Sequence, residues 1–214
     1  MRILKEGFPF IVSPFIGGIA LIIIPAMGYI QFVPGCVILL QLMGGILLLF
    51  ACFCIFFFRD PKIKINNKEN AILSPCNGTV MEIEEAENKK IIRVFLSLFS
   101  VHLQRSPVDG TVTEINHTDG KFLAAWNTRA HILNEQNSFT IQSTDGVYVV
   151  RQVAGFLARR CVSWVKEGDT LKAGDKIGMI KFSSQVDLFM PGTIEIKVKK
   201  GDKIRAGITI AGKR

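Results

Sequence analysis

The sequence predicts a mainly β protein that is preceded by a transmembrane helical hairpin. No Asp, Glu, Lys or Arg occurs in the 52 residues from Gly7 to Phe58, although the 214-residue chain carries 44 charged residues. Residues 59–214 are about 26% charged, and their short apolar runs are separated by Gly, Asp and Asn, which is typical of strands in a globular domain. This composition excludes a disordered chain and a disulfide-stapled miniprotein.

The uncharged run is long enough for two membrane spans, because a helix needs roughly 20 apolar residues to cross a bilayer core. Gln31, Pro34 and Gly35 favour a break in its middle. Within a membrane hairpin of residues 1–58 we therefore expect two spans, at about 10–30 and 36–57. A cleaved signal peptide is the alternative, but its apolar core would be only about 7–15 residues long.

Basic residues flank the hairpin on both sides. Arg2 and Lys5 precede it, and a basic linker over residues 59–70 follows it. The positive-inside tendency then places both flanks, and with them a domain of residues 71–214, on the cytoplasmic face of the cell (inner) membrane. The five cysteines form no C-x-x-C pair, which agrees with a reducing compartment. Residues 59–214 carry a net charge of +7. Because a membrane hairpin precedes them, we expect this charge to attract an anionic membrane leaflet rather than nucleic acid.

The C-terminal domain is expected to consist of short strands with one or two short helices. The best helix signal covers residues 152–160, with a turn around 122–126. The clearest strand signals cover residues 79–83, 91–98, 139–141, 147–150, 176–182, 186–189 and 193–198.

Two internal repeats refine this fold. Residues 74–80 (SPCNGTV) recur as residues 106–112 (SPVDGTV), and residues 165–174 (VKEGDTLKAG) recur as residues 198–207 (VKKGDKIRAG). The Gly-Asp turn followed by a second glycine is similar to the corners of the biotinyl/lipoyl fold, where glycine supplies a positive φ. We therefore predict a biotinyl/lipoyl-like β-sandwich or barrel with pseudo-repeated halves, a fold that by itself specifies no chemistry.

Few residues are placed for chemistry. The histidines, at positions 102, 117 and 131, have no metal-binding spacing, so we predict no metal site, and neither a G-x-S-x-G elbow nor a phosphate-binding glycine loop occurs. His102 and the pair Ser183-Ser184 remain. A lone histidine and a serine pair are more often structural than catalytic, so these residues alone do not identify a reaction.

A resemblance to a known family indicates which reaction these residues would carry out. Residues 182–187 (FSSQVD) are similar to the F-G-S-x-V-D cleavage motif of the short phosphatidylserine decarboxylases, a pyruvoyl-dependent family. The resemblance extends over about residues 71–211, and the N-terminal hairpin also fits the short form of the family. Further motifs match in order at residues 73–78 (the S-P-A-D-G motif), 101–107 (V-H-x-N-R-x-P), 134–135 (N-E-R) and 151–160 (R-Q-V-A-G-x-x-A-R-R).

The resemblance implies a self-cleaving lyase. Ser184 would attack the preceding carbonyl, which would separate a β chain of residues 1–183 from an α chain of residues 184–214 that stay together as a heterodimer. The pyruvoyl cofactor left from Ser184 would form a Schiff base with phosphatidylserine and act as an electron sink while carbon dioxide leaves, which yields phosphatidylethanolamine in phospholipid biosynthesis. His102 would transfer protons.

The same motifs contain the other predicted site residues. Arg105 and Arg151 are expected to bind the substrate. The sequence is compatible with a homo-oligomer and does not specify the oligomeric state.

Two positions depart from the family motifs. Ser183 replaces the glycine before the nucleophile and is the minor candidate for it, and Asn77 replaces the Asp of S-P-A-D-G, a residue that the family is thought to use in self-cleavage. Because an amide cannot accept a proton as a carboxylate does, three hypotheses follow: slow maturation, replacement by Asp109 or Asp187, or deamidation of the Asn77-Gly sequence. A maturation-deficient homologue is the fourth.

The rival interpretation is a membrane-anchored biotinyl/lipoyl-like binding or adaptor module. A carrier would present a modifiable lysine, typically in Met-Lys-Met, and an adaptor would contain a long heptad hairpin. The sequence contains neither feature.

Overall fold

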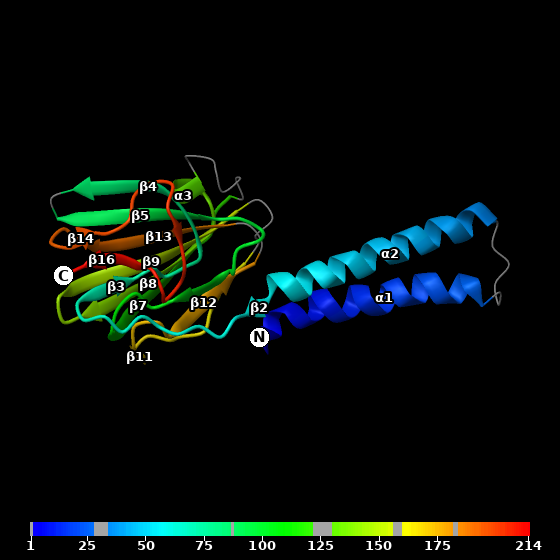
Figure 1. Cartoon of the computed structure of the whole chain (residues 1–214), viewed down its shortest axis with the longest axis horizontal. Coiled ribbons are helices and arrows are strands. Elements are labelled where there is room, and N and C mark those ends of the chain that lie inside the picture. Colours follow the sequence, from blue (N-terminus) through cyan, green and yellow to red (C-terminus); the bar gives the residue numbers. More distant parts are fainter. Residues whose placement is uncertain (1, 28–33, 87, 122–129, 156–159, 182–183) are drawn as a thin grey trace. The chain divides into compact units, whose positions relative to one another are not determined.

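The computed structural model describes residues 2–27, 34–86, 88–121, 130–155, 160–181 and 184–214. The chain divides into two compact units, Met1–Lys62 and Ile63–Arg214 (Figure 1). Each unit has its own secondary structure and its own packing.

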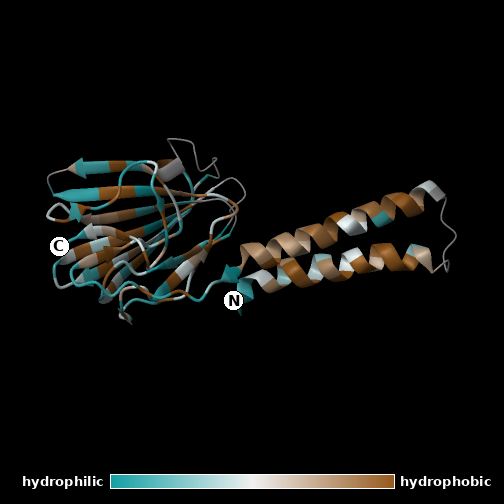
Figure 2. Cartoon of the chain, viewed as in Figure 1, coloured by the Kyte–Doolittle hydropathy of each residue, from teal (hydrophilic) through white to brown (hydrophobic). Residues whose placement is uncertain are grey.

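Unit 1 is a helical hairpin. Helices α1 (Phe8–Ala26) and α2 (Pro34–Phe57) are both long and apolar enough to cross a membrane, and hydrophobic residues line most of their length (Figure 2). The first helix ends at Ala26, before the predicted end of the span, and residues 28–30 of that span lie outside the described residues. The 3-10 helix η1 (Lys5–Gly7) precedes α1, and β1 (Arg2–Ile3) pairs antiparallel with β2 (Arg59–Asp60).

The two helices approach closely at a pair of glycines. A Cβ atom added to Gly18 would lie 2.8 Å from the carbonyl oxygen of Gly44, and one added to Gly44 would lie 2.7 Å from that of Gly18. Small residues at such a contact let two helix backbones pack tightly, which is a common arrangement between helices in lipid.

Unit 2 is a mainly β domain, as the sequence predicts. Eight antiparallel strands form a curled sheet in the order β11-β7-β8-β9-β13-β5-β4-β15 (Figure 1). Two smaller sheets, in the orders β10-β12-β6 and β14-β16-β3, complete the domain, together with a short helix, α3 (Ala130–Leu133). The strands are β3 (Ala71–Leu73), β4 (Gly78–Ala86), β5 (Lys89–Leu96), β6 (Leu103–Arg105), β7 (Gly110–Thr118), β8 (Gln136–Ser143), β9 (Gly146–Ala154), β10 (Cys161–Ser163), β11 (Thr170–Leu171), β12 (Lys176–Ile180), β13 (Ser184–Pro191), β14 (Glu195–Ile196), β15 (Lys203–Ile204) and β16 (Ile210–Lys213).

One predicted helix is wrong over its first residues. Residues 152–154 form the end of strand β9, and they pair with β8 on one side and with β13 on the other. Backbone partners on both sides stabilise the extended conformation here, so tertiary pairing overrides the local helix signal. Residues 156–159 and the predicted turn at 122–126 lie outside the described residues.

The internal repeats form equivalent corners of the domain. The side-chain oxygen Oδ1 of Asn77 accepts the backbone N–H of Ala206 at 2.6 Å, and Oδ1 of Asp109 accepts that of Ala173, also at 2.6 Å. The glycine after each alanine has a positive φ, +68° in one copy and +92° in the other, which explains why both repeats end in glycine. The predicted pseudo-repeated halves are therefore present in hydrogen bonding as well as in sequence.

Candidate active site

The predicted nucleophile, Ser184, is the first residue of β13 and lies at one end of the large sheet. The register pairs it with Leu96 of β5 on one side and with Ala154 of β9 on the other. Phe182 and Ser183, which complete the predicted cleavage sequence, lie outside the described residues. The backbone that follows the predicted cleavage point is therefore held between two strands.

Asn134 supports the strand next to Ser184. Its amide Nδ2 donates a hydrogen bond of 2.6 Å to the carbonyl oxygen of Ala154, and the N–H of Ala154 donates to the carbonyl oxygen of Glu135 at 2.9 Å. Asn134 is 1% exposed. Sequence reasoning included Asn134 and Glu135 only as part of a motif; in the structure they hold the residue that pairs with Ser184.

His102 lies just before β6 and is buried. Its carbonyl oxygen accepts the N–H of Ile180 at 3.1 Å, and Ile180 is the last residue of β12, four residues before Ser184. Its ring atom Nδ1 lies 3.0 Å from the carbonyl oxygen of Ser100. Since a carbonyl can only accept, Nδ1 carries the proton and Nε2 is the basic nitrogen of the neutral ring. His102 is thus suited to accept or return a proton through Nε2.

A chain of buried amides ends at the same carbonyl of His102. Asn137 Nδ2 donates to Gln152 Oε1 at 3.1 Å, Gln152 Nε2 donates to Gln104 Oε1 at 2.7 Å, and Gln104 Nε2 donates to the carbonyl oxygen of His102 at 2.9 Å. All four residues are at most 4% exposed. Because every amide donates in the same direction, the bonds polarise one another and hold the His102 peptide beside Ile180. Nothing in the spacing of these residues predicts the chain, since it joins strands that are distant in sequence.

Replacing Gln152 with leucine tests this chain. The variant would leave Gln104 Oε1 without its donor and Asn137 Nδ2 without its acceptor in a buried place, and we expect a loss of about 1–3 kcal/mol in the free energy of unfolding. Chemical denaturation of the purified protein measures the loss. The exposed Gln142→Leu on β8 is the matched control and should change stability by less than about 0.5 kcal/mol. Equal stability of the two variants would contradict a structural role for the chain.

Asn77 lies at the same end of the sheet as Ser184. Phe95 of β5 pairs with Thr79 on one side and with Gln185 on the other, so Asn77 and Ser184 lie near the same level, two strands apart. At the usual strand spacing this separation is roughly 10 Å. Asn77 is therefore near the candidate nucleophile, although its Oδ1 atom is hydrogen-bonded to the backbone of Ala206.

The two acids proposed as replacements for Asn77 lie at different distances from Ser184. Asp109 precedes β7 at the end where Thr111 pairs with Gln142, which is the end of the sheet opposite Ser184. Asp187 lies three residues further along β13, again about 10 Å from Ser184 at the usual rise of a strand, and it accepts a 2.6 Å hydrogen bond from the side chain of Gln185. The strand register therefore argues against Asp109 as a replacement, whereas it places Asp187 at about the same distance from Ser184 as Asn77, about 10 Å.

The two predicted substrate-binding arginines are not brought together. Arg105 is buried and donates from Nη1 to the carbonyl oxygen of Gly174 at 2.7 Å, which gives it a structural role in a corner of the domain. Arg151 pairs with Asp187 in the sheet, and its guanidinium lies 4.6 Å from the centre of the Phe189 ring. Substrate binding by these arginines stays a prediction.

Neither Cys76 nor Cys161, the two thiols of unit 2, is suited to act as a nucleophile. Cys161 pairs with Ile180, which lies four residues before Ser184 in the chain. Burial, with a smaller contribution from the carboxylate of Glu135, raises the pKa of the Cys161 thiol to about 12. Burial also raises the pKa of Cys76, with a further contribution from Asp187. Both groups therefore remain thiols at neutral pH, and the thiolate is the reactive form. Over the part of the chain that the structure describes, no three metal-binding side chains cluster.

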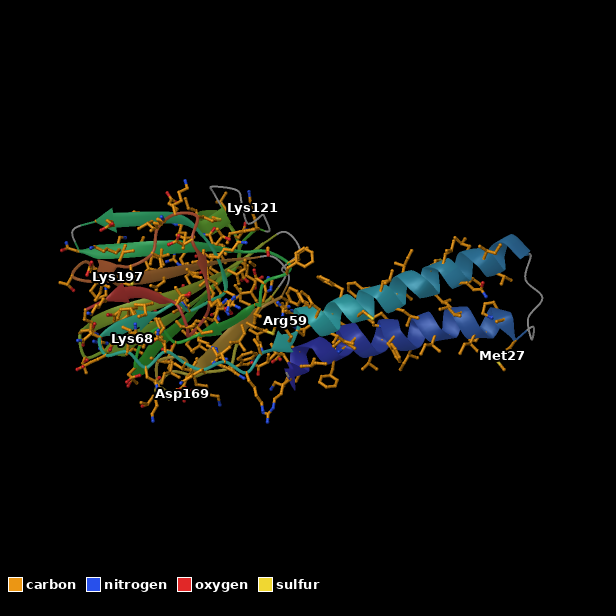
Figure 3. All side chains as sticks on the ribbon, viewed as in Figure 1. Met27, Arg59, Lys68, Lys121, Asp169 and Lys197 are labelled. Carbon is orange, nitrogen blue, oxygen red and sulfur yellow. The ribbon has the colours of Figure 1, made fainter. Side chains whose placement is uncertain are left out.

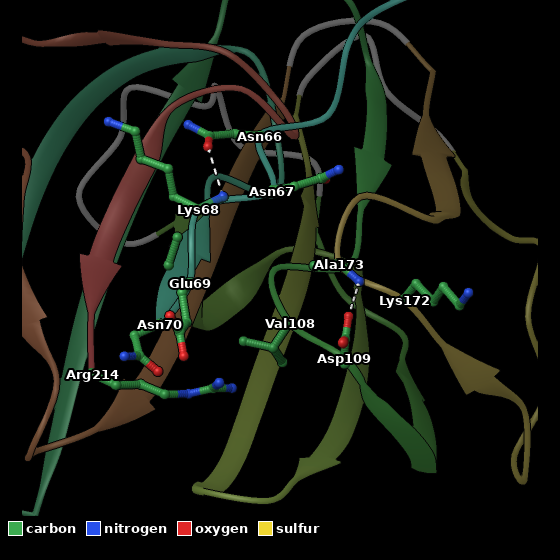
Figure 4. Close-up of a pocket in the computed structure, with 11 residues that line it drawn as sticks. Asn66, Asn67, Lys68, Glu69, Asn70, Val108, Asp109, Lys172, Ala173 and Arg214 are labelled. Carbon is green, nitrogen blue, oxygen red and sulfur yellow. Dashed lines mark hydrogen bonds between the residues drawn. The ribbon is translucent and has the colours of Figure 1, made fainter.

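A polar pocket of about 390 Å³ lies around the other pseudo-symmetric corner (Figure 4). Its lining includes Lys172, Arg214 and Asp109, whose bond to the backbone of Ala173 is drawn in Figure 4. Arg214 also contacts Asp145 in the β8–β9 hairpin, at the end of the sheet opposite Ser184. This pocket is therefore remote from the candidate nucleophile.

Taken together, fold and site define a class of protein: a mainly β domain joined to a hairpin of membrane length, with a serine and a buried histidine at one end of its sheet. A family model described as phosphatidylserine decarboxylase matches residues 50–212. A phosphatidylserine decarboxylase proenzyme of Carboxydothermus hydrogenoformans is 39% identical over 179 residues, which are 80% of this chain and 84% of the relative. Relatives with the same description from Magnetococcus marinus and Geotalea uraniireducens are 38% and 35% identical, and the matches cover 98% of this chain and 94% and 95% of theirs.

The chain belongs to the phosphatidylserine decarboxylase family. This family membership confirms the resemblance found in the sequence, and with it a lyase of phospholipid metabolism that is made as a proenzyme. The alternative of a membrane-anchored binding or adaptor module is not favoured.

Proposed function

We propose that the chain cleaves itself between Ser183 and Ser184 and that the mature protein converts phosphatidylserine to phosphatidylethanolamine and carbon dioxide. The observation that carries the proposal is the position of Ser184, paired with Leu96 and Ala154 at the sheet end that adjoins His102. A reacting group needs such a fixed position, because misplacement of even about 1 Å slows a reaction severely.

The proposed maturation is a sequence of bond changes on the chain itself. The hydroxyl oxygen of Ser184 attacks the carbonyl carbon of residue 183, and the amide becomes an ester as the nitrogen is released. Loss of the Cα proton then breaks the Cβ–Oγ bond, so that residue 183 leaves as a carboxylate. One water molecule replaces the nitrogen, which departs as ammonia, and a pyruvoyl group remains at residue 184. His102 Nε2 is the candidate base for these proton transfers.

The surroundings of residue 184 fit a covalently held pyruvoyl group. Strand β13 lies in the middle of the sheet between β5 and β9, so residues 184–191 would stay paired after the chain is cut. This central position also supports the proposed heterodimer, because the 31-residue fragment contributes strands β13, β14, β15 and β16. The pyruvoyl group, once formed, supplies an electron sink for the electrons left when carbon dioxide departs. His102 would then return a proton to the product.

The hairpin is proposed to anchor the protein in the cell (inner) membrane with unit 2 on the cytoplasmic face. Two apolar helices of spanning length support an anchor, and the basic residues on both flanks support the orientation. An anionic leaflet would attract the net positive charge of residues 59–214 and would contain the anionic lipid substrate.

Intact-mass measurement of the purified protein tests the proposal directly. We expect two fragments of 183 and 31 residues, roughly 20 and 3 kDa, and the smaller one should resist amino-terminal sequencing. Phosphatidylserine in mixed micelles should then release carbon dioxide. A chain that stays at 23.8 kDa and releases none would instead identify a maturation-deficient homologue.

Exchanging Asn77 for aspartate tests the missing carboxylate. Asn77→Asp keeps the Oδ1 acceptor for Ala206 and should fold normally, while a carboxylate near Ser184 should speed self-cleavage, roughly 10²-fold for a positioned base. A gel time course after synthesis measures the rate. Asp109→Asn makes the reverse exchange at the equivalent corner, at the opposite end of the sheet, and should leave the rate unchanged. Equal rates for native protein and Asn77→Asp would remove position 77 from the maturation chemistry, unless peptide mass spectrometry finds aspartate there in the native chain, which would indicate deamidation.

A further inference from the structure

Exposed apolar side chains gather at the sheet end that holds Ser184. Phe99 is 71% exposed, and Ile132 and Leu133 of α3 are 66% and 37% exposed. We call these three residues the apolar rim. At this exposure the three side chains are not part of the core of unit 2, whose residues are almost fully buried.

The strand register shows that both parts of the rim lie at this end. Phe99 lies in the turn after β5, where the N–H of Ser100 donates to the carbonyl oxygen of Ser97 at 2.9 Å, and the last residue of β5 is Leu96, the partner of Ser184. Helix α3 directly precedes Asn134, whose side chain holds the carbonyl oxygen of Ala154 on the other side of Ser184. The rim thus borders the candidate site on two sides.

Basic residues belong to the same segments. The N–H of Lys121 donates to the carbonyl oxygen of Leu133 at 2.6 Å, so this lysine, labelled in Figure 3, adjoins the rim. The N–H of Lys181 donates to the carbonyl oxygen of Arg160 at 3.3 Å, and Lys181 lies three residues before Ser184 in the chain. Glu135 and Asp119 are the neighbouring acids, so the three cations outnumber the acids in these segments. Apolar side chains flanked by cations are the composition of a surface that enters the interface of an anionic bilayer.

We propose that the apolar rim is the surface by which unit 2 docks on an anionic phospholipid bilayer, with Phe99, Ile132 and Leu133 inserted at the level of the headgroups and upper acyl chains. The covalent link to a hairpin of membrane length keeps unit 2 within reach of a bilayer. The use of this surface rests on the proposed function: a lipid headgroup could reach Ser184 while its acyl chains stay in the bilayer. The docking itself does not require catalysis, so the two can be tested separately.

Tryptophan quenching measures the docking. Three variants of the full chain are compared, Phe99→Trp, Ile132→Trp and Val147→Trp. Each is placed in vesicles of phosphatidylglycerol and of phosphatidylcholine that is brominated on its acyl chains. Val147 is the matched control, because it is 46% exposed and lies in the β8–β9 hairpin at the opposite end of the sheet. The native chain, with its Trp126 and Trp164, supplies the background to be subtracted.

We expect bromine to quench the added fluorescence at positions 99 and 132 and to leave that at position 147 unquenched. Replacing phosphatidylglycerol with neutral lipid should weaken the quenching, because the cations then lose their partners. Equal quenching at all three positions, or none at positions 99 and 132, would overturn the proposal. The same measurement on chains that also carry Ser184→Ala should give the same result, so docking can be established even if the proposed decarboxylation fails.

A kinetic readout complements the quenching. The double variant Phe99→Ser, Ile132→Ser should raise the KM for phosphatidylserine in vesicles roughly tenfold, since two exposed apolar side chains no longer enter the bilayer. Its kcat, and its KM for a short-chain, monomeric phosphatidylserine, should stay unchanged. A fall in kcat with both substrates, at unchanged KM, would assign these residues to the chemistry or the stability of the site and would contradict docking.

Discussion

The Ser184→Ala variant is expected to remain a single chain of 23.8 kDa and to release no carbon dioxide from phosphatidylserine. The methyl side chain has no oxygen to attack the preceding carbonyl, so neither the ester nor the pyruvoyl group can form. The effect should be complete rather than partial, because maturation precedes every turnover. Denaturing gels and intact-mass measurement, taken over days after purification, check the result.

Two controls make this prediction specific. Ser183→Ala should still mature, since the acyl shift requires only a carbonyl at position 183. If Ser183→Ala stays whole while Ser184→Ala is cut, the nucleophile is the other serine. Thermal unfolding should show Ser184→Ala folded, because residues 185–191 keep their partners in β5 and residues 185–189 keep theirs in β9. A folded Ser184→Ala chain that is still cut at the same bond would refute the proposed chemistry.

Replacing His102 with glutamine is expected to lower the decarboxylation rate of the matured protein by about 10²–10⁴-fold, the usual contribution of a positioned proton-transfer group. Glutamine can still donate a hydrogen bond to the carbonyl oxygen of Ser100, as Nδ1 of His102 does, but an amide has no basic nitrogen. The measurement is kcat and KM for phosphatidylserine in mixed micelles, corrected for the cleaved fraction of each preparation. We expect the loss in kcat, with KM nearly unchanged.

The matched control is His117→Gln. His117 is half exposed at the end of β7 and lies 3.3 Å from Asp119, and it is not part of the proposed site. This variant should retain the native rate. A His102→Gln protein that matures and turns over as fast as the His117→Gln protein would exclude His102 from proton transfer. Slow maturation of His102→Gln would show, in addition, that the same imidazole serves both stages.

The membrane hairpin, the repeated corners and the family could be predicted from the sequence, because each depends on residues that are close together in the chain. An uncharged run of 52 residues is long enough for two apolar helices, and the structure contains two of spanning length. The Gly-Asp turns and their repeats predicted pseudo-equivalent corners, since a glycine at positive φ is needed wherever the chain turns in that way. The F-S-S-x-V-D sequence and the ordered motifs around it were specific enough to indicate the family that the comparisons confirm.

Other features depended on strand register, which the local sequence does not specify. The two repeated corners are similar in sequence, yet pairing places Asn77 near Ser184 and Asp109 at the opposite end of the sheet. Pairing on both sides also made residues 152–154 a strand where the local pattern favoured a helix.

What the sequence by itself determined was therefore the kind of protein: a hairpin of membrane length, a mainly β domain with repeated corners, and the serine and histidine that a family motif singles out. Only the tertiary structure decided which residues surround them. The amides that hold the carbonyl of His102 come from β6, β8 and β9, and the apolar rim comes from two separate segments. Such groupings arise because hydrogen bonds between strands join residues that are far apart in the chain, and no local periodicity encodes that register.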